Sequence, residues 1–264
     1  MKSLLASLLC AAALPVWGQA CPKAVRIGFN DTESPPMLMG RGERFQDPPG
    51  WQVDAVREAL TKLGCLSVAE LLRLPARRLN ILLAQGDVDF ALLYGVTPER
   101  LKTLRFPLDA RGQPDAAWAP VFGRLVLFAR LGTPAQAGWD GQRLPQGWRV
   151  GVMAGSVQEA VARSHGWPVE PFTAADFGLQ MLNAQRFELL LTSREALSPE
   201  ARAAITEWGT TARMPFFAPA SVAFAERHPA WTRAFWNEFC RTMRQLQPDV
   251  RPVNCGIAPP GAVR

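Results

Sequence analysis

The sequence predicts an α/β fold built from two series of alternating strands and helices. Residues 25–29 (VRIGF) form a short strand-like segment, and residues 53–63 carry apolar side chains three or four positions apart, as one face of a helix does. Residues 88–94 (VDFALLY) are nearly all apolar, which is typical of a central parallel strand covered on both faces. The alternation begins again at residue 124. Strands that alternate with helices along a chain indicate a mostly parallel sheet with helices packed on it.

The other elements of the first series are separated by Gly and Pro. Residues 66–73 (LSVAELLR) have a helical composition, but they lie between a cysteine and a proline, and we interpret them as the next strand. The series also includes a helix over residues 77–85, ended by a glycine, and a helix start after the Gly-Val-Thr-Pro turn at residues 95–98.

The second series repeats this pattern without repeating the sequence. Helices are predicted from Ser156 and over residues 175–184, and an amphipathic helix over residues 229–246 ends the fold. An extended stretch with two prolines, residues 211–225, precedes that last helix. The strands of this series are expected at residues 124–130, 148–153, 169–172 and 188–192.

The two series predict two lobes joined by two crossing segments. We expect residues 21–123 and 219–264 to form the first lobe and residues 124–218 to form the second. Bending between the lobes is expected in the crossing segments, near residues 122–128 and 214–222.

The first twenty residues predict an export signal. Lys2 is followed by an apolar run over residues 4–17, too short to span a bilayer, and Gly18-Gln19-Ala20 then offers a cleavage site before Cys21. We therefore expect a periplasmic protein that begins at Cys21. A lipid anchor on Cys21 is the less favoured alternative, because a lipobox prefers leucine where Gly18 stands.

Charge and composition exclude some partners. The formal net charge is +6 at pH 7, but the arginines are scattered and form no basic block, so no nucleic-acid partner is predicted. The hydrophobic content of 48% is enough for sizeable cores and argues against disorder. We expect a monomer that uses no cofactor.

Four cysteines remain after cleavage, and an even number in an oxidising compartment predicts two disulfides. Of the three pairings, we favour Cys21 with Cys65 and Cys240 with Cys255. Cys21 precedes the first strand, and Cys65 ends a helix that returns antiparallel to that strand. Two histidines and no C-x-x-C motif give no reason to expect a metal site.

Three polar segments follow predicted strands: residues 30–34, 94–100 and 154–158. In an open parallel sheet, ligands bind at the carboxyl ends of the strands, where helix N-termini offer free N–H groups. Gly155 would let the backbone approach a ligand, Ser156 would cap a helix, and Arg100 could pair with a carboxylate through its planar fork. The alternative is a solvated arginine and an ordinary helix cap without a ligand.

The order of five segments resembles the family 3 periplasmic solute-binding proteins, the amino-acid-type receptors of ABC importers. The resemblance covers essentially the whole mature chain and implies the type II periplasmic-binding fold, in which two α/β lobes close over a ligand. It also implies that Arg100 grips a ligand carboxylate and that Ser156 and Val157 add donors. The segments are VRIGFNDTESPP (25–36), GWQVDAVREALTKLG (50–64), LLAQGDVDFALLYGVTPERLKTLRFP (82–107), WRVGVMAGSVQEAV (148–161) and LNAQRFELLLTS (182–193).

The sequence departs from that family where the amino group of a ligand would bind. Leu93, Tyr94 and Gly95 stand where Ser or Thr is usual, and Thr192 or Ser193 stands where an aspartate is usual. A buried ammonium without a carboxylate partner is costly. Either Asp31 or Glu33 therefore supplies that charge, or the ligand lacks an α-amino group.

The remaining candidate ligand contacts are Asn30, in the first polar segment, and the aromatic rings of Tyr94 and Trp51, which could stack on a ligand.

The resemblance implies a binding protein without covalent chemistry, which captures a small carboxylate-bearing solute by hinge closure for an ABC transporter permease. Two alternatives remain open. One is a solute-binding component of a sensor or redox system. The other is a periplasmic lyase resembling cyclohexadienyl dehydratases, with Glu33 as general acid or base.

Overall fold

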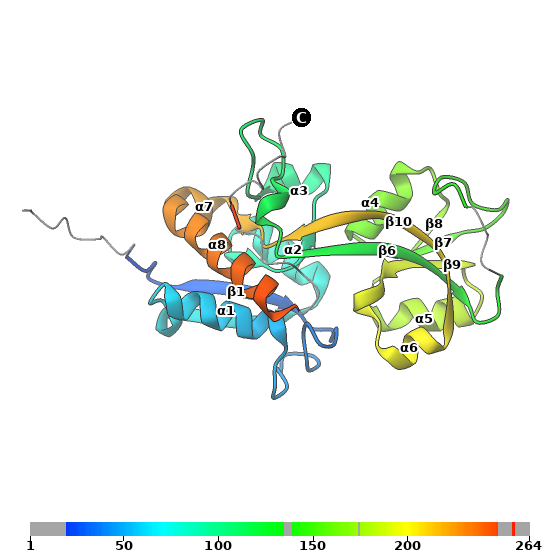
Figure 1. Cartoon of the computed structure of the whole chain (residues 1–264), viewed down its shortest axis with the longest axis horizontal. Coiled ribbons are helices and arrows are strands. Elements are labelled where there is room, and N and C mark those ends of the chain that lie inside the picture. The colour runs from blue at the N-terminus through cyan, green and yellow to red at the C-terminus, as the bar shows by residue number, and fades with distance from the viewer. Residues whose placement is uncertain (1–19, 135–138, 174, 248–254, 257–264) are drawn as a thin grey trace, which may run out of the picture.

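The computed structural model describes residues 20–134, 139–173, 175–247 and 255–256. These residues form two lobes connected by a pair of long strands (Figure 1). The predicted export signal at residues 1–20 lies outside the described residues, apart from Ala20. No helix within the described ranges is long and apolar enough to span a membrane.

The first lobe is built on a five-stranded sheet. Its members are β1 (Val25–Asn30), β2 (Ala69–Leu74), β3 (Phe90–Ala91), β5 (Leu104–Arg105) and β11 (Ala220–Ser221). The spatial order is β2-β1-β3-β11-β5, with β1 parallel to both of its neighbours and β11 antiparallel to its own. Because β11 is distant in sequence from the other strands, this lobe uses both ends of the described chain.

Helices bury the faces of the first sheet. They are α1 (Trp51–Lys62), α2 (Ala76–Gln85), α3 (Pro98–Thr103), α7 (Val222–Arg227) and α8 (Pro229–Leu246), with short 3-10 turns at Leu66–Val68 and Ala116–Trp118. Phe90 of β3 contacts the rings of Phe224, Trp231 and Phe235, which attaches α7 and α8 to the sheet. All four rings are buried, so the lobe has a well-packed aromatic core.

The second lobe is built on a six-stranded sheet in the order β4-β10-β6-β9-β7-β8. The strands are β4 (Tyr94–Gly95), β6 (Val121–Arg130), β7 (Val150–Met153), β8 (Val169–Phe172), β9 (Leu189–Ser193) and β10 (Ile205–Phe217). The helices are α4 (Val157–Ser164), α5 (Ala175–Asn183) and α6 (Pro199–Ala203), with a 3-10 turn at Arg194–Ala196. β7 is parallel to β8 and β9, as alternating strands and helices predict.

β6 and β10 are the two crossing segments, and they run antiparallel between the lobes (Figure 1). Their register extends from Ile205 opposite Arg130 to Phe216 opposite Val121, with two irregularities between. At the end near the first lobe, Tyr94 and Gly95 pair with Phe217 and Phe216. The second sheet therefore extends through the crossing into the first lobe.

The last helix fixes the start of the first crossing strand. Arg244 on α8 is buried and donates from Nε to the carbonyl oxygen of Ala119 at 3.0 Å. Gln247 donates to the carbonyl oxygen of Pro120, also at 3.0 Å. Both bonds hold the backbone just before β6, so the first lobe supports the base of the crossing.

Two disulfides join the pairs that the sequence predicts. Cys21 is bonded to Cys65, and Cys240 is bonded to Cys255. The described residues contain no group of three or more His, Cys, Asp or Glu placed to hold a metal ion.

One sequence prediction is wrong in a way that matters for the site: residues 88–94 do not form one strand. β3 contains only Phe90 and Ala91. Leu93 has a φ of 56°, in the left-handed region, and this turn sends Tyr94 and Gly95 into the other sheet. The run is mostly buried, but apolar side chains carry no signal for the turn.

Other differences concern where elements begin. Residues 66–68 form a 3-10 turn, and the predicted strand runs from Ala69 to Leu74. The extended stretch expected at residues 211–225 begins at Ile205 and ends where α7 starts at Val222. The short helix α6 was not predicted.

Candidate ligand-binding cleft

A cleft of about 550 Å³ lies between the lobes, with the crossing strands contributing to its lining. Each ligand contact proposed from the sequence lines this cleft, although the residues come from distant parts of the chain. They are Asn30, Glu33, Trp51, Tyr94, Gly95, Arg100, Gly155, Ser156, Val157 and Ser193, together with Asp31 and Thr192. The structure therefore brings the predicted residues together.

Arg100 bridges the two lobes. Thr97 caps the short helix α3 by accepting the N–H of Arg100, and Pro98 opens its first turn. The guanidinium donates from Nη1 to the carbonyl oxygen of Gly95 at 2.8 Å and from Nη2 to that of Gly155, in the second lobe, at 3.0 Å. It also lies 4.5 Å from the centroid of the Tyr94 ring, so this aromatic face contacts an arginine.

The charge of Arg100 has no carboxylate partner among the described residues. Burial lowers the pKa of its guanidinium, and Tyr94 partly opposes that shift. Burial also raises the pKa of Tyr94 to about 12, against the effect of the arginine. The cleft thus contains a desolvated cation that binds only neutral carbonyl oxygens, an arrangement that an anion would stabilise.

The side chains at the N-terminus of α4 resemble a capping box, except that the acid at the third helical position bonds to the N–H of the residue before the cap. Ser156 accepts the N–H of Glu159 and donates its own hydroxyl to the carbonyl oxygen of Met153. The Glu159 carboxylate accepts the N–H of Gly155 at 2.7 Å and pairs with Arg163. Burial raises the pKa of Glu159, but these two partners outweigh it and the net pKa lies below its ordinary value.

The donors of Ser156, which the sequence assigns to a ligand, are therefore used within the protein, as is the N–H of Gly155. Val157 is the first residue of α4, and the N–H groups in the first turn of a helix have no hydrogen-bond partner within that helix.

The lobes touch where Val157 meets Gly95. A Cβ added to Gly95 would lie 2.7 Å from three side-chain atoms of Val157, and Val157 is buried. Glycine is required here by the close approach of the second lobe. This contact and the Arg100 bridge lie at the same seam, so the structure has its lobes closed at this side of the cleft.

A buried arginine shapes the opposite wall. Arg73 on β2 donates to the carbonyl oxygens of Met39, Asp31 and Gly40 at 2.6–2.8 Å. These bonds fix the loop after β1, which begins beyond Asn30 and carries Glu33. Burial lowers the pKa of Arg73, and Asp31 and Glu33 oppose the shift.

The other residues predicted in this wall are less constrained. Asn30 is exposed at the end of β1, and Glu33 pairs with Arg41 at 3.4 Å. Trp51 is the first residue of α1 and packs against the core of the first lobe.

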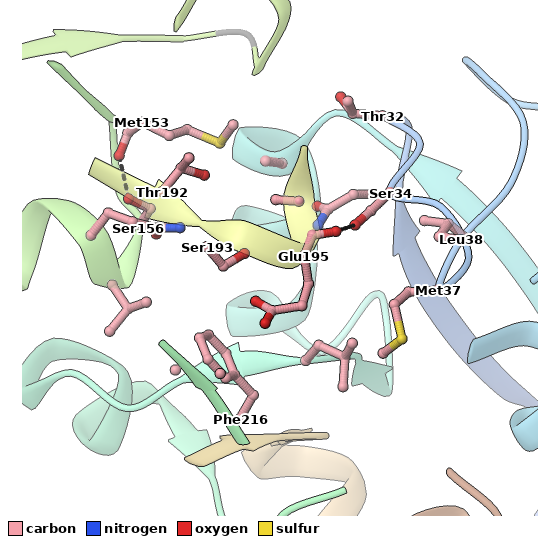
Figure 2. A pocket seen from close by; sticks show the side chains of 18 of the residues that line it. Thr32, Ser34, Met37, Leu38, Met153, Ser156, Thr192, Ser193, Glu195 and Phe216 are labelled. Atoms are coloured by element: carbon pink, nitrogen blue, oxygen red, sulfur yellow. Dashed lines mark hydrogen bonds between the residues drawn. The ribbon is translucent and has the colours of Figure 1, made fainter. Parts of the chain in front are cut away.

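The sequence prediction missed a second contact between the lobes. Ser34 donates its hydroxyl to the carbonyl oxygen of Glu195 at 3.0 Å, and Figure 2 shows the Glu195 side chain extending into the pocket towards Phe216. Glu195 lies two residues beyond the end of β9. Its position just after the end of a strand was the one sequence signal for a place in the cleft, but nothing in the sequence predicts its contact with Ser34. Arg202 of α6 also lines the cleft and was not predicted.

No family model and no curated protein matches this sequence. Solved structures match nearly the full chain. An ancestral arginine-binding protein bound to arginine has a TM-score of 0.58 at 16% identity, over 87% of this chain and 95% of that one. A histidine kinase sensor domain with similarity to periplasmic binding proteins has a TM-score of 0.60 at 14% identity, over 85% and 91%.

A third similar structure is the ancestral amino acid-binding protein AncCDT-1, a precursor of cyclohexadienyl dehydratase. Its TM-score is 0.57 at 15% identity, over 84% of this chain and 90% of that one. The chain has the type II periplasmic-binding-protein fold. The prediction of that fold, with two mixed α/β lobes, is confirmed. At these identities the likeness extends to the fold alone, and the same fold serves binding, sensing and a protein that precedes an enzyme.

Proposed function

We propose that this protein is a periplasmic solute-binding protein that captures a small carboxylate-bearing solute in the cleft between its lobes and delivers it to an ABC transporter permease. The protein acts without covalent chemistry, as a monomer, and its ligand is an atypical amino-acid-like molecule. The single observation that carries the proposal is the state of Arg100, a desolvated cation in the cleft that forms no ion pair within the described chain.

The chemistry of Arg100 favours an anionic ligand. A guanidinium has five N–H donors, and the two hydrogen bonds to Gly95 and Gly155 use two of them. A carboxylate at the remaining donors would replace water with a charge-assisted bond, which is about twice as strong as a neutral one. The ring of Tyr94 limits the movement of the guanidinium and so reduces the entropy lost on binding.

The seam between the lobes supports capture by closure. Arg100 contacts Gly155, Val157 packs on Gly95, and Ser34 binds Glu195, and each of these contacts joins one lobe to the other. A ligand that adds contacts to both lobes would favour this closed arrangement over an open one.

The alternative functions would use the same cleft. A sensor or redox component would differ in its partner and not in its ligand site. A lyase would need an acid beside the substrate. Glu33, the candidate from the sequence, is paired with Arg41, whereas Glu195 in the cleft forms no ion pair within the described residues, so the test must include a search for product.

The test is native mass spectrometry of protein purified from its own periplasm, with Arg57→Met as the control variant. Arg57 is an exposed arginine on α1 that does not line the cleft. We expect a small acid to co-purify with the wild-type protein and with Arg57→Met, and to be lost from Arg100→Met. Retention of the molecule by Arg100→Met would refute the role of Arg100. Conversion of the co-purified acid into a product, when that acid is added back to the protein, would support the lyase instead.

A further inference from the structure

We propose that Glu195 is the counter-charge for a cationic group of the solute, so that the cleft selects dipolar molecules that carry both a carboxylate and a cation. This inference rests on the proposed function and specifies the class of ligand. It goes beyond the sequence prediction, in which either Asp31 or Glu33 supplies the negative charge or the ligand has no α-amino group.

The backbone of Glu195 is held at the seam between the lobes. Glu195 is in the 3-10 turn Arg194–Ala196, directly after β9, and its carbonyl oxygen accepts the Ser34 hydroxyl from the first lobe. Its side chain leaves that contact and enters the pocket between Ser193 and Phe216 (Figure 2). The position of the carboxylate therefore depends on the same closure that would enclose a ligand.

The carboxylate of Glu195 forms no hydrogen bond or ion pair with any described residue. Its neighbour Arg194 pairs with Glu207 at 3.0 Å. By contrast, Glu33 is paired with Arg41, and the Asp31 carboxylate accepts the Thr32 hydroxyl at 3.4 Å and lies in the field of the buried Arg73 cation. Of the three acidic side chains in the cleft, Glu195 is thus the one left to meet a ligand cation.

The strands of the six-stranded sheet allow the positions of Glu195 and Arg100 to be compared. Oε2 of Glu195 lies 3.8 Å from the point where a Cβ on Gly123 of β6 would be, while Arg100 is bonded to the carbonyl oxygen of Gly95 on β4. One strand, β10, separates β4 from β6. Two strand spacings place these backbone positions on the order of 10 Å apart. No ion pair joins Arg100 to Glu195 in the described part of the chain, and this separation of the backbone positions leaves room for a small molecule between the two side chains.

These opposite charges determine which solute fits. A solute with a carboxylate alone would satisfy Arg100 but would bring negative charge towards Glu195, which costs free energy as the cleft closes. A dipolar solute would satisfy both groups. Because the Glu195 side chain is exposed within the cleft, solvent screens its charge, so we expect a moderate effect of about tenfold in affinity.

The test uses isothermal titration of the full mature protein with each of the twenty standard L-amino acids. Every amino acid that binds is compared with its deamino acid, in which hydrogen replaces the ammonium. For lysine and arginine, norleucine and citrulline test the side-chain cation. The variant is Glu195→Gln, and the control is Glu43→Gln, an exposed glutamate outside the cleft.

We expect Glu195→Gln to weaken binding of a dipolar probe about tenfold, with Glu43→Gln unchanged. Removing the cation from the probe should weaken binding to the wild type by a similar factor and have little further effect in Glu195→Gln. If a dipolar probe binds the wild type and Glu195→Gln equally, or if the analogue that lacks the cation binds as tightly as the dipolar probe, Glu195 does not have this role and only the proposed function survives. If none of the twenty amino acids binds the wild type, this inference is overturned, and the proposed function is decided by whether a small acid co-purifies with the protein.

Discussion

Gly95→Ala should open the lobes without unfolding either of them. The backbone of Gly95 is not in the left-handed region, so alanine is tolerated there by the strand itself. Its Cβ would lie 2.7 Å from the Cβ and both Cγ atoms of Val157, well inside the 3.5–4.0 Å at which carbon atoms attract. Val157 belongs to the other lobe, so separation of the lobes relieves the clash.

The size of the effect follows from the crowding. Overpacking of this kind costs about 1–3 kcal/mol. Because the open arrangement escapes that cost, the ratio of closed to open molecules should fall by roughly 5- to 150-fold. The free energy of unfolding of each lobe should change little, because no contact within a lobe is lost.

Small-angle X-ray scattering of the ligand-free protein measures this shift. We expect the wild type to scatter as the closed structure does and Gly95→Ala to show a larger radius of gyration. Val157→Gly, added to Gly95→Ala, removes all three clashing atoms and should restore the compact form. A Gly95→Ala protein that scatters like the wild type, or a double variant that stays expanded, would refute the reasoning.

Three further predictions concern stability. Burial raises the folded-state pKa of Asp89, although the bond from the backbone N–H of Arg26 opposes the shift, so the stability that Asp89 contributes is present below about pH 4 and is lost as the pH rises through the folded pKa. Asp89→Asn should therefore remove the fall in the free energy of unfolding between about pH 4 and 8, measured with urea. The same fall in the variant as in the wild type would contradict this. Replacing Cys21 and Cys65 with serine should cost about 4 kcal/mol in the same assay, because the disulfide closes a sequence separation of 44 residues; equal stability would contradict this. Arg73→Met should increase amide exchange in residues 31–40, since three carbonyl oxygens lose their donor, and unchanged exchange would show that the loop is held by other contacts.

Periodic elements were predictable because their patterns follow from local geometry. The strand at residues 25–29 and the helix after residue 50 were correct to within a few residues, since burial of one face leaves a clear spacing of apolar side chains. The turn at Leu93 was not predictable. A leucine in the left-handed region has no sequence signature, and it is imposed by the pairing of the next two residues with β10.

Much of the lining of the candidate cleft was predictable from the sequence, but its hydrogen bonding was not. The carboxyl ends of the strands bring Asn30, Arg100 and Ser156 to one cleft, as the rule for open sheets implies. The hydroxyl of Ser156 donates to the carbonyl oxygen of Met153, and this bond depends on the backbone conformation of the turn. The contact between Ser34 and Glu195 joins residues 161 positions apart in the sequence, and no local sequence pattern predicts such a contact.

The position of β11 inside the first sheet has a consequence for the order of folding. β11 lies between β3 and β5, so this sheet has a gap until residues 220–221 are available. Apart from β4, the strands of the second sheet come from one continuous stretch, residues 121–217, and can pair as soon as that stretch exists. The lobe that begins the chain is therefore the one completed last, when α7 and α8 return to cover it.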